Sequence, residues 1–262
     1  MPRKIKAVDV FSTPFEVYEE RNSTMEEMRA LVEQEKSIPE AMQIRVRLTE
    51  TISNHAEAAE RMLRVGADNA LESHVDRQIS ESSQHKELLA MMPEQVPEML
   101  ASYQSEYQGH LLREADEAIN VHGVAMPEGQ FLFHGGVLSG NDRSFTTTRP
   151  LSTSFCPQVA LRNAEWKGKA FDAGRVELAL LRVQGQSHRA FVFGTGGDHS
   201  HEKEVVFASG IQLTRASETY VTDVDVVKVT SSLQELRKKV PAYLVEFEID
   251  TAPAGDTPDE HS

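Results

Sequence analysis

Apolar and polar positions follow different patterns in the two halves of the chain. Residues 15–120 are rich in Glu, Met, Ala, Gln and Arg and contain almost no glycine, a composition that favours helices. Residues 23–26 and 37–40 each have the Ser-x-x-Glu spacing of a capping box, the second with proline inside the first turn. These signals predict four or five helices, which we assign to an N-terminal helical lobe spanning residues 1–125.

The repeat of apolar residues in this half also has a helical spacing. Ile44, Leu48 and Ile52 recur every four residues, which places them on one face of a helix. Further helices are expected through His85–Met92 and from about Pro97 to Val121. The lobe would then be a bundle that supplies packing and contributes to the choice of substrate.

The second half, residues 126–250, has the pattern of a β protein. Gly, Thr, Val and Phe become more frequent, and short apolar runs lie between turn residues, as expected for strands. Helical signal is confined to residues 157–164 and 232–238. A helical half followed by a strand-rich half predicts an α+β fold with a mainly antiparallel sheet. Residues 251–262 carry Pro, Gly and acids and are expected to be a disordered tail. The predicted strands are Phe131–Phe133, Val176–Val183, Ala190–Phe193, Val205–Phe207, Tyr220–Val229 and Tyr243–Ile249.

Composition excludes several classes of function. Of the 262 residues, 39% are hydrophobic and 26% are charged, and the formal net charge is -14. Nucleic acid is a disfavoured partner because binding to phosphate backbones needs clustered Lys and Arg. No apolar run approaches the length of about 20 residues that crosses a bilayer, and the N-terminus does not resemble a standard secretory signal. Cys156 is the single cysteine, so an intramolecular disulfide and a cysteine-based zinc cluster are excluded.

Two motifs in the second half place polar groups at the ends of strands. The first is an apolar strand that delivers His134 and is followed by Gly135 and Gly136; glycines there allow a ligand to approach the backbone. The second, residues 152–154, is Ser-Thr-Ser on a short strand. Small hydroxyl side chains can hold neighbouring polar groups without adding bulk.

A third motif combines two acids with a glycine-rich loop. Glu202 and Glu204 are separated by one lysine, follow the loop Gly194–Asp198 and lead into an apolar run. Alternation along a strand would put both carboxylates on the same face. Each motif alone has an ordinary structural interpretation, since strand ends often carry a structural histidine or solvated acids.

The order and spacing of the three motifs resemble the ADP-ribosyltransferase superfamily. His-Gly is followed by Ser-Thr-Ser about 20 residues later and by Glu-x-Glu about 50 residues further on. The runs Val176–Val183 and Ala190–Phe193 resemble the family's middle strands, and residues 204–210 resemble its catalytic strand and the turn after it. The resemblance covers residues 130–250 and implies a core of two packed, mainly antiparallel sheets around an NAD cleft. It also makes the preceding helices similar to the lobe that flanks this cleft in bacterial toxin-like members.

The resemblance implies roles for the acids and hydroxyls. Breaking the bond between nicotinamide and ribose in NAD develops positive charge on the ribose, which a fixed carboxylate stabilises. Glu204 is the candidate for that carboxylate. Glu202 would meet the acceptor, either orienting an arginine or taking its proton. Ser152 would position Glu204 by a hydrogen bond, and Thr153 and Ser154 would complete the cofactor-binding strand.

One departure from the family pattern concerns the cofactor. Toxin-like members with Ser-Thr-Ser and Glu-x-Glu usually carry arginine where this chain has His134, and the branch with His-Gly has tyrosine in its second motif. Arg143 or Arg149 could supply the missing phosphate contact, and we expect His134 and Gly135 to contact NAD. Trp166 and Phe171 lie in the segment that resembles the family's loop over the phosphates and nicotinamide. Either ring could stack on nicotinamide, although Trp166 could equally be a packed core residue.

Other interpretations remain open from the sequence. Asp198, His199 and His201 could bind a metal, although we expect none. Cys156 could be a nucleophile, but nothing beside it in sequence would activate it. A chain with this fold could also hydrolyse NAD without a protein acceptor, or bind NAD or a protein without catalysis.

The resemblance as a whole predicts a mono-ADP-ribosyltransferase that moves ADP-ribose from NAD to a side chain of a protein and releases nicotinamide. By analogy with the toxin-like members, we expect a monomeric bacterial or phage effector that acts on a host protein in the host cytosol. Its partners would be NAD and that protein, with no nucleic acid and no membrane. Glu-x-Glu resembles arginine-directed members, and the unusual His134 leaves a hydroxyl acceptor open. Without a standard signal peptide, the chain would use a dedicated secretion apparatus or stay in the cytoplasm.

Overall fold

A computed structural model describes residues 5–34, 36–105, 112–138, 142–185, 188–194 and 203–250. The chain separates into two compact units, Phe11–Asn54 and a larger unit formed by Met1–Val10 with His55–Ser262. The predicted boundary between residues 125 and 126 falls inside the larger unit. The predicted tail, residues 251–262, lies outside the described residues.

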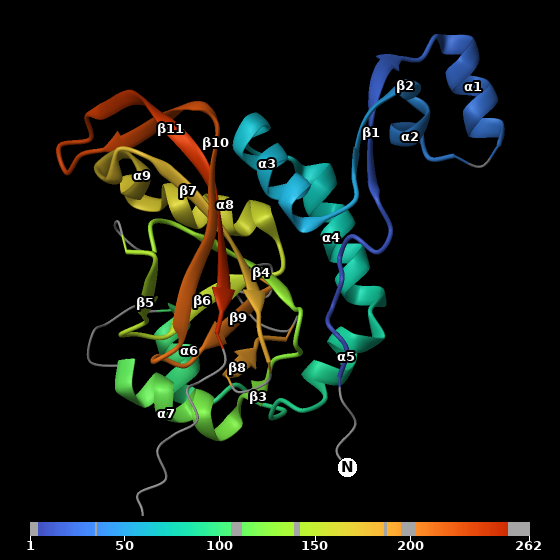
Figure 1. The fold of residues 1–262 in the computed structure, drawn as a ribbon. Helices are drawn as coiled ribbons and strands as arrows, with labels where there is room; N and C mark the ends of the chain where they lie inside the picture. The colour runs from blue at the N-terminus through green and yellow to red at the C-terminus, as the bar shows by residue number, and fades with distance from the viewer. Residues whose placement is uncertain are drawn as a thin grey trace, which may run out of the picture. The chain divides into compact units, whose positions relative to one another are not determined.

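The smaller unit is a hairpin of two strands with two helices between them. Strands β1 (Phe15–Asn22) and β2 (Gln43–Ile52) pair antiparallel, and α1 (Met25–Glu33) and α2 (Ile38–Ala41) lie between them in sequence (Figure 1). The prediction of a helix through residues 44–52 is therefore wrong. A spacing of four is also a multiple of the two-residue period of a strand, so the same apolar positions fit one face of either element.

The first predicted helix exists, but its cap is displaced by one residue. Thr24, and not Ser23, is the N-cap of α1, and its side chain accepts a hydrogen bond from the backbone N–H of Glu27. The Glu27 carboxylate accepts in return from the backbone N–H of Thr24 at 2.9 Å. This reciprocal pair is a capping box with the Thr-x-x-Glu spacing.

The larger unit combines helices with a large sheet, which confirms the α+β class. Seven of its described segments are α-helices, and a short 3-10 turn, η2 (Trp166–Gly168), links two of them. The α-helices are α3 (His55–Val65), α4 (Asn69–Glu81), α5 (Ser83–Leu89), α6 (Glu98–Ser105), α7 (Leu112–His122), α8 (Pro157–Glu165) and α9 (Lys169–Ala173). The strands are β3 (Val124–Ala125), β4 (Phe131–Gly135), β5 (Ser144–Thr146), β6 (Leu151–Ser154), β7 (Val176–Val183), β8 (Arg189–Val192), β9 (Glu204–Phe207), β10 (Gln212–Val229) and β11 (Glu235–Ile249).

The described strands of this unit join in one hydrogen-bonded order, β3-β8-β9-β6-β4-β7-β11-β10-β5. The expectation of a mainly antiparallel sheet is confirmed, since β7 and β11 form the single parallel pair among these strands. Two separate packed sheets were expected. Instead, β4 pairs with β7 along five residues and with β6 only at Phe133 and Ser154, so one narrow contact holds the two halves of the sheet together.

Residues 232–238 were expected to be helical, and this prediction is wrong. They lie at the turn and first residues of the long hairpin formed by β10 and β11, where Val229 pairs with Glu235. Leu233 in this turn has φ of +60° and is 85% exposed. The pairing of the two strands on either side of the turn outweighs the helix propensity of these residues.

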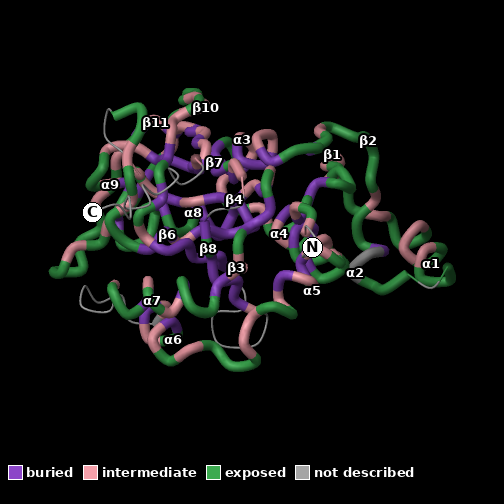
Figure 2. The backbone as a smooth tube through the Cα atoms, turned by 60° about the horizontal axis from the view of Figure 1, so that its bottom comes forward, coloured by how far each residue is buried: buried purple, intermediate pink, exposed green. Residues whose placement is uncertain are grey.

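Buried residues follow the strands and the helices that cover them (Figure 2). Helices α3 and α8 pack against β4, β7, β10 and β11. On the other half of the sheet, apolar side chains from α6 and α7 pack on β8 and β9, with Leu100 and Ile119 meeting Phe191 and Val206. Helix α8 contacts both β4 and β6, so it lies across the junction between the two halves of the sheet.

Candidate active site

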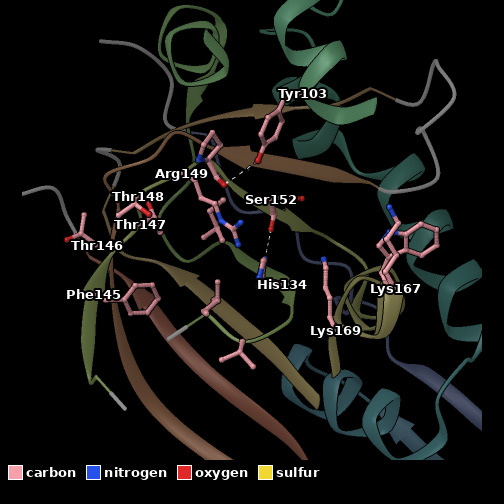
Figure 3. Close-up of a pocket in the computed structure, with 15 residues that line it drawn as sticks. Tyr103, His134, Phe145, Thr146, Thr147, Thr148, Arg149, Ser152, Lys167 and Lys169 are labelled. Carbon is pink, nitrogen blue, oxygen red and sulfur yellow. Dashed lines mark hydrogen bonds between the residues drawn. The ribbon is translucent and has the colours of Figure 1, made fainter. Parts of the chain in front are cut away.

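A cavity of about 700 Å³ opens beside the junction of β4 and β6 (Figure 3). Its lining comes from α6, from β4, from residues 145–152 and from η2 and α9. His134, Arg149, Ser152, Trp166 and Lys169 are among the polar and aromatic residues of this lining. Sequence segments separated by more than 60 residues therefore meet at one cavity because β4 and β6 are neighbours in the sheet.

Glu204 and Ser152 form the best-defined contact of the site. Strands β6 and β9 are antiparallel, with Ser154 opposite Glu204, so Ser152 and Glu204 have side chains on the same face. The Ser152 hydroxyl donates to Glu204 Oε1 at 2.5 Å. Glu204 is only 7% exposed, and this bond connects it to the cavity lining.

A second donor to Glu204 comes from a helix. The side-chain amide of Gln104, on α6, donates to Glu204 Oε2 at 2.8 Å. Its neighbour Tyr103 lines the cavity and donates to the carbonyl oxygen of Pro150 at 3.4 Å. Sequence reasoning missed both residues, because nothing in the local pattern of a helix reports which strand it will cover.

The strand that was predicted to carry both Glu202 and Glu204 does not include Lys203, the residue between them. Strand β9 begins at Glu204, and Lys203 has φ of +50°, in the left-handed region that a strand does not use. Glu202 lies outside the described residues, as do Asp198, His199 and His201. The argument that strand alternation puts the two acids on one face does not hold through Lys203.

The buried side chain of Lys203 forms ion pairs with two acids of α4. Its side chain is 6% exposed, and its ammonium lies 2.9 Å from Asp76 Oδ1 and 3.5 Å from Glu72 Oε1, both on α4. Glu72 also accepts from Arg162 on α8 at 2.9 Å. These contacts compensate for the strained backbone and attach the start of β9 to two helices.

His134 is neutral and oriented by the backbone. Its Nδ1 lies 2.7 Å from the carbonyl oxygen of Ser152; a carbonyl only accepts, so Nδ1 carries the proton. Burial, the largest cause, together with the nearby charges of Lys169 and Arg149, lowers the pKa of His134 to about 4 against the opposing effect of this hydrogen bond. The Nε2 atom is then left as an acceptor at neutral pH.

The cavity has a cationic lining in a chain of strongly negative net charge. Arg149, Lys167 and Lys169 all line it. A smaller adjoining cavity of about 250 Å³ adds Arg175 and Glu177, and the Arg175 guanidinium pairs with the buried Glu177 carboxylate at 2.9 Å. Arg149 and Lys169 are the cations that both cavities share. Such a lining suits a phosphate-bearing ligand.

The two predicted stacking residues have different environments. Trp166 lines the large cavity and is 60% exposed, so it is not a packed core residue. Phe171 is half-buried and lies under the ammonium of Lys238, 4.5 Å from the ring centroid, and it lines neither of these cavities. Of these two residues, Trp166 is therefore the one that can stack on a ligand in the cavity, whose lining also contains the rings of Tyr103 and Phe145.

Thr153 and Ser154 hold the backbone around Ser152. The Thr153 hydroxyl donates to the carbonyl oxygen of Val205 at 2.6 Å, and Ser154 Oγ accepts from the backbone N–H of Cys156 at 3.1 Å. Both residues are 3% exposed. Burial also raises the pKa of Cys156, which keeps it a thiol.

Gly135 is required for packing as well as lining the smaller cavity. A Cβ placed on it would lie 1.6 Å from the carbonyl oxygen of Ala160, so its missing side chain lets α8 lie directly on β4. Gly136 has φ of +117°, and the space that a Cβ would occupy there is open. At Gly136 the backbone conformation, and not crowding, therefore favours glycine.

The described residues contain neither a metal site nor a membrane span of the usual kinds. In this part of the chain, no group of three or more His, Cys, Asp and Glu side chains could hold a metal ion. No helix among the same residues is long and apolar enough to cross a membrane.

Comparison with known proteins gives matches at the level of structure. No protein-family model matches the sequence, and no curated protein matches it. The structure is similar to that of C3stau2 from S. aureus, solved with NAD, at 10% identity and a TM-score of 0.41 over 64% of this chain and 92% of that one. It is similar to Vis toxin, an ADP-ribosyltransferase from Vibrio splendidus, at 14% identity and a TM-score of 0.32 over 90% of this chain and 91% of that one.

A third similar structure is C3larvin toxin, an ADP-ribosyltransferase from Paenibacillus larvae, at 11% identity and a TM-score of 0.38 over 65% of this chain and 96% of that one. Vis and C3larvin belong to the superfamily that the three sequence motifs resemble. Since these identities are 14% or lower and these TM-scores are below 0.5, the residues of the cavity must carry the functional conclusion.

Proposed function

We propose that this protein is a mono-ADP-ribosyltransferase, which transfers ADP-ribose from NAD to a side chain of an acceptor protein and releases nicotinamide. The observation that carries the proposal is the Glu204 carboxylate, fixed by Ser152 at 2.5 Å beside a cationic cavity of about 700 Å³. A buried, oriented carboxylate next to a phosphate-binding lining is what this reaction needs.

Glu204 acts on the bond that breaks. The bond between ribose C1′ and the nicotinamide nitrogen breaks, its electron pair leaves with nicotinamide, and positive charge develops on the ribose. A fixed carboxylate that is shielded from water stabilises this charge more than the neutral ground state. Ser152 keeps the carboxylate oriented, so no reorganisation is needed when the charge appears.

The cavity lining supplies contacts to the rest of NAD. Arg149 and Lys169 bind the diphosphate, in place of the arginine that toxin-like members carry at the position of His134. His134 accepts a hydrogen bond from a ribose hydroxyl at Nε2, since its Nδ1 proton is already donated to the Ser152 carbonyl. Trp166 stacks on an aromatic ring of NAD.

The acceptor nucleophile then attacks C1′ and loses a proton, and Glu202 is the group proposed to orient it or take that proton. The acceptor is a protein side chain, with arginine preferred from the Glu-x-Glu pattern. Following the toxin-like resemblance, we assign the protein to the effectors that act on a protein of another cell, in the cytosol of that cell.

Hydrolysis of NAD is the second candidate. The left-handed backbone at Lys203 removes the strand geometry that would hold Glu202 beside Glu204 on the acceptor side. With water in place of the acceptor side chain, the same carboxylate would give ADP-ribose and nicotinamide.

The test uses NAD labelled on the adenylate side, the purified protein, a eukaryotic cell lysate and the variants Glu204→Gln and Glu98→Gln. Glu98 is exposed at the start of α6, so Glu98→Gln is a matched control that should behave like the wild type. Label on a lysate protein that is lost only in Glu204→Gln supports transfer, and mass spectrometry of the labelled protein identifies its acceptor side chain.

The other outcomes separate the alternatives. Release of nicotinamide that depends on Glu204, without label on any protein, would replace transfer by hydrolysis. NAD binding without nicotinamide release would indicate a non-catalytic module with this fold. Unchanged activity in Glu204→Gln would refute the mechanism.

A further inference from the structure

We infer that Gln104 is a positioning residue for the Glu204 carboxylate, a role that rests on the proposed function of Glu204. The two oxygens of this carboxylate have different donors: Ser152 Oγ donates to Oε1 at 2.5 Å, and Gln104 Nε2 donates to Oε2 at 2.8 Å. One donor comes from the neighbouring strand and the other from a helix about 100 residues earlier in the chain.

The helix holds Gln104 in place through its neighbours. Leu100 and Tyr103, on the same helix α6, are buried against Phe191 and Val206 in one apolar cluster. The Tyr103 hydroxyl also donates to the carbonyl oxygen of Pro150, just before β6. Because these contacts already hold α6 against the sheet, the glutamine loses little further freedom when it bonds Glu204.

Two donors on different oxygens fix the plane of the carboxylate. The bond from Gln104 on Oε2 adds to the bond from Ser152 on Oε1 and so restricts rotation of the group about its last side-chain bond. Each carboxylate oxygen can accept more than one hydrogen bond, so a positioning donor on each does not by itself exclude a ribose hydroxyl. Positioning by Gln104 and Ser152 is therefore compatible with the catalytic role of the same carboxylate.

Gln104 also favours the ionised form of Glu204. Hydrogen bonds donated to a carboxylate stabilise its charged state and lower its pKa, and an amide remains a donor at every pH at which the protein is folded. Removing the amide leaves Glu204 easier to protonate. Since the reaction needs the carboxylate ionised, activity would then be lost at a higher pH as the solution is acidified.

The charged and titratable side chains near Glu204 on the described elements are bonded to groups other than its carboxylate, or lie on the cavity lining. Lys203 precedes it, but its ammonium is bonded to Asp76 of α4. On β4, His134 donates to the Ser152 carbonyl, and on α7 Asp116 accepts from the backbone N–H of Ser209 at 2.7 Å. Strand β8 presents apolar residues to β9, and Arg149 precedes β6 on the cavity lining.

The experiment measures nicotinamide release against pH for the wild type, Gln104→Met and Gln104→Glu, with Gln95→Met as the matched control. Gln95 is exposed shortly before α6. Gln104→Met keeps the length of the side chain and removes the donor. A hydrogen bond to a charged group contributes enough to predict a fall of about tenfold in kcat and a shift of about one pH unit in the acid limb of the profile, with Kd for NAD changed by less than about threefold.

Gln104→Glu puts a second carboxylate against Glu204. Two carboxylates in contact share a proton, so the acid limb should move further toward high pH than in Gln104→Met. Gln95→Met should leave the profile unchanged. The pH of the acid limb is therefore expected to be highest in Gln104→Glu, lower in Gln104→Met and equal to the wild-type value in Gln95→Met. If Gln104 served folding alone, its variants would give less active protein, but the acid limb would stay at the wild-type pH.

An acid limb that stays at the wild-type pH in both Gln104 variants would overturn the inference, even if their rates fall. Failure of the proposed function looks different, because it leaves the wild type without nicotinamide release or Glu204→Gln with full release. In that case the pKa of Glu204 is measured directly by carboxyl-carbon NMR in the wild type and Gln104→Met. A higher pKa in the variant supports the contact, and an equal pKa refutes it.

Discussion

The hydroxyl of Ser152 donates to the carboxylate of Glu204 at 2.5 Å, which joins the middle of β6 to the first residue of β9. The bond crosses from the cavity lining to a nearly buried acid. It can form because the antiparallel register places Ser154 opposite Glu204, so Ser152 lies diagonally across on the same face. This contact is the structural core of the proposed mechanism.

We predict that Ser152→Ala lowers nicotinamide release by about 10- to 100-fold, since a hydrogen bond to a charged group contributes about 1.5–3 kcal/mol. Steady-state kinetics with NAD measures this. Ser154→Ala on the same strand is the comparison, because its hydroxyl accepts from the Cys156 backbone and its loss should lower the midpoint of thermal unfolding more than the turnover. Equal turnover in Ser152→Ala and the wild type would contradict the role of this bond.

Trp166 and Phe171 give a second, paired prediction. Trp166→Ala should raise KM for NAD by about tenfold, because an exposed ring on the cavity lining contributes about 1–1.5 kcal/mol when it stacks. Phe171→Ala removes a ring that contacts Lys238 and should change KM much less. Steady-state kinetics and calorimetric titration with NAD measure the effect of both substitutions. A larger effect in Phe171→Ala than in Trp166→Ala would assign the stacking role to Phe171.

His134 should make stability depend on pH below neutrality. Its pKa is about 4 in the folded protein and about 6.5 when unfolded, so the unfolded state binds more protons between these values. The free energy of unfolding therefore falls as pH decreases from about 6.5 to about 4, by at most about 1.4 kcal/mol per pH unit for each such histidine. His55, which burial also shifts to a pKa of about 4, adds to the same slope.

Replacing His134 by Asn isolates its share of that slope. The Asn amide can still donate to the Ser152 carbonyl but does not titrate. Denaturant unfolding between about pH 4 and pH 7 should show a smaller slope in His134→Asn than in the wild type. An identical slope would mean that the pKa of His134 is the same in the folded and the unfolded protein.

Gly135 should be intolerant of a side chain. In Gly135→Ala the new Cβ would lie 1.6 Å from the Ala160 carbonyl oxygen, so α8 must move off β4. Overpacking of this kind costs about 1–3 kcal/mol of stability. Gly194→Ala is the control, because nothing lies within 4 Å of its Cβ position. Thermal unfolding of both variants checks the difference, and a stable Gly135→Ala would show that the helix can shift without cost.

The sequence predicted the strand-rich half well because its signals are local. The apolar runs through Phe133, Val176–Val183 and Val205–Phe207 are strands, and each was bounded by turn residues. The first half was predicted less well. Ile44, Leu48 and Ile52 fit a helix and a strand equally, and the choice was made by pairing with β1, which lies more than 20 residues earlier.

The candidate site shows the same division between local and distant information. The motif residues His134, Ser152 and Glu204 could be selected from their order along the chain, and the structure brings Ser152 into contact with both of the others. Gln104 could not be selected, since a glutamine in a helix has no local feature that distinguishes it. The left-handed backbone conformation of Lys203 could not be predicted either, because the acids that pair with its side chain lie on α4, far away in the sequence.

What the sequence determined by itself was therefore the α+β class, most of the strands and the kind of residue at the site, because hydrophobic period and residue chemistry are properties of short segments. Only the tertiary structure decided that α6 donates to Glu204, that Trp166 and not Phe171 lines the cavity, and that Arg149 and Lys169 meet at one place. These are contacts between segments far apart in the chain, and they are fixed by strand order and helix packing, which no short window of sequence contains.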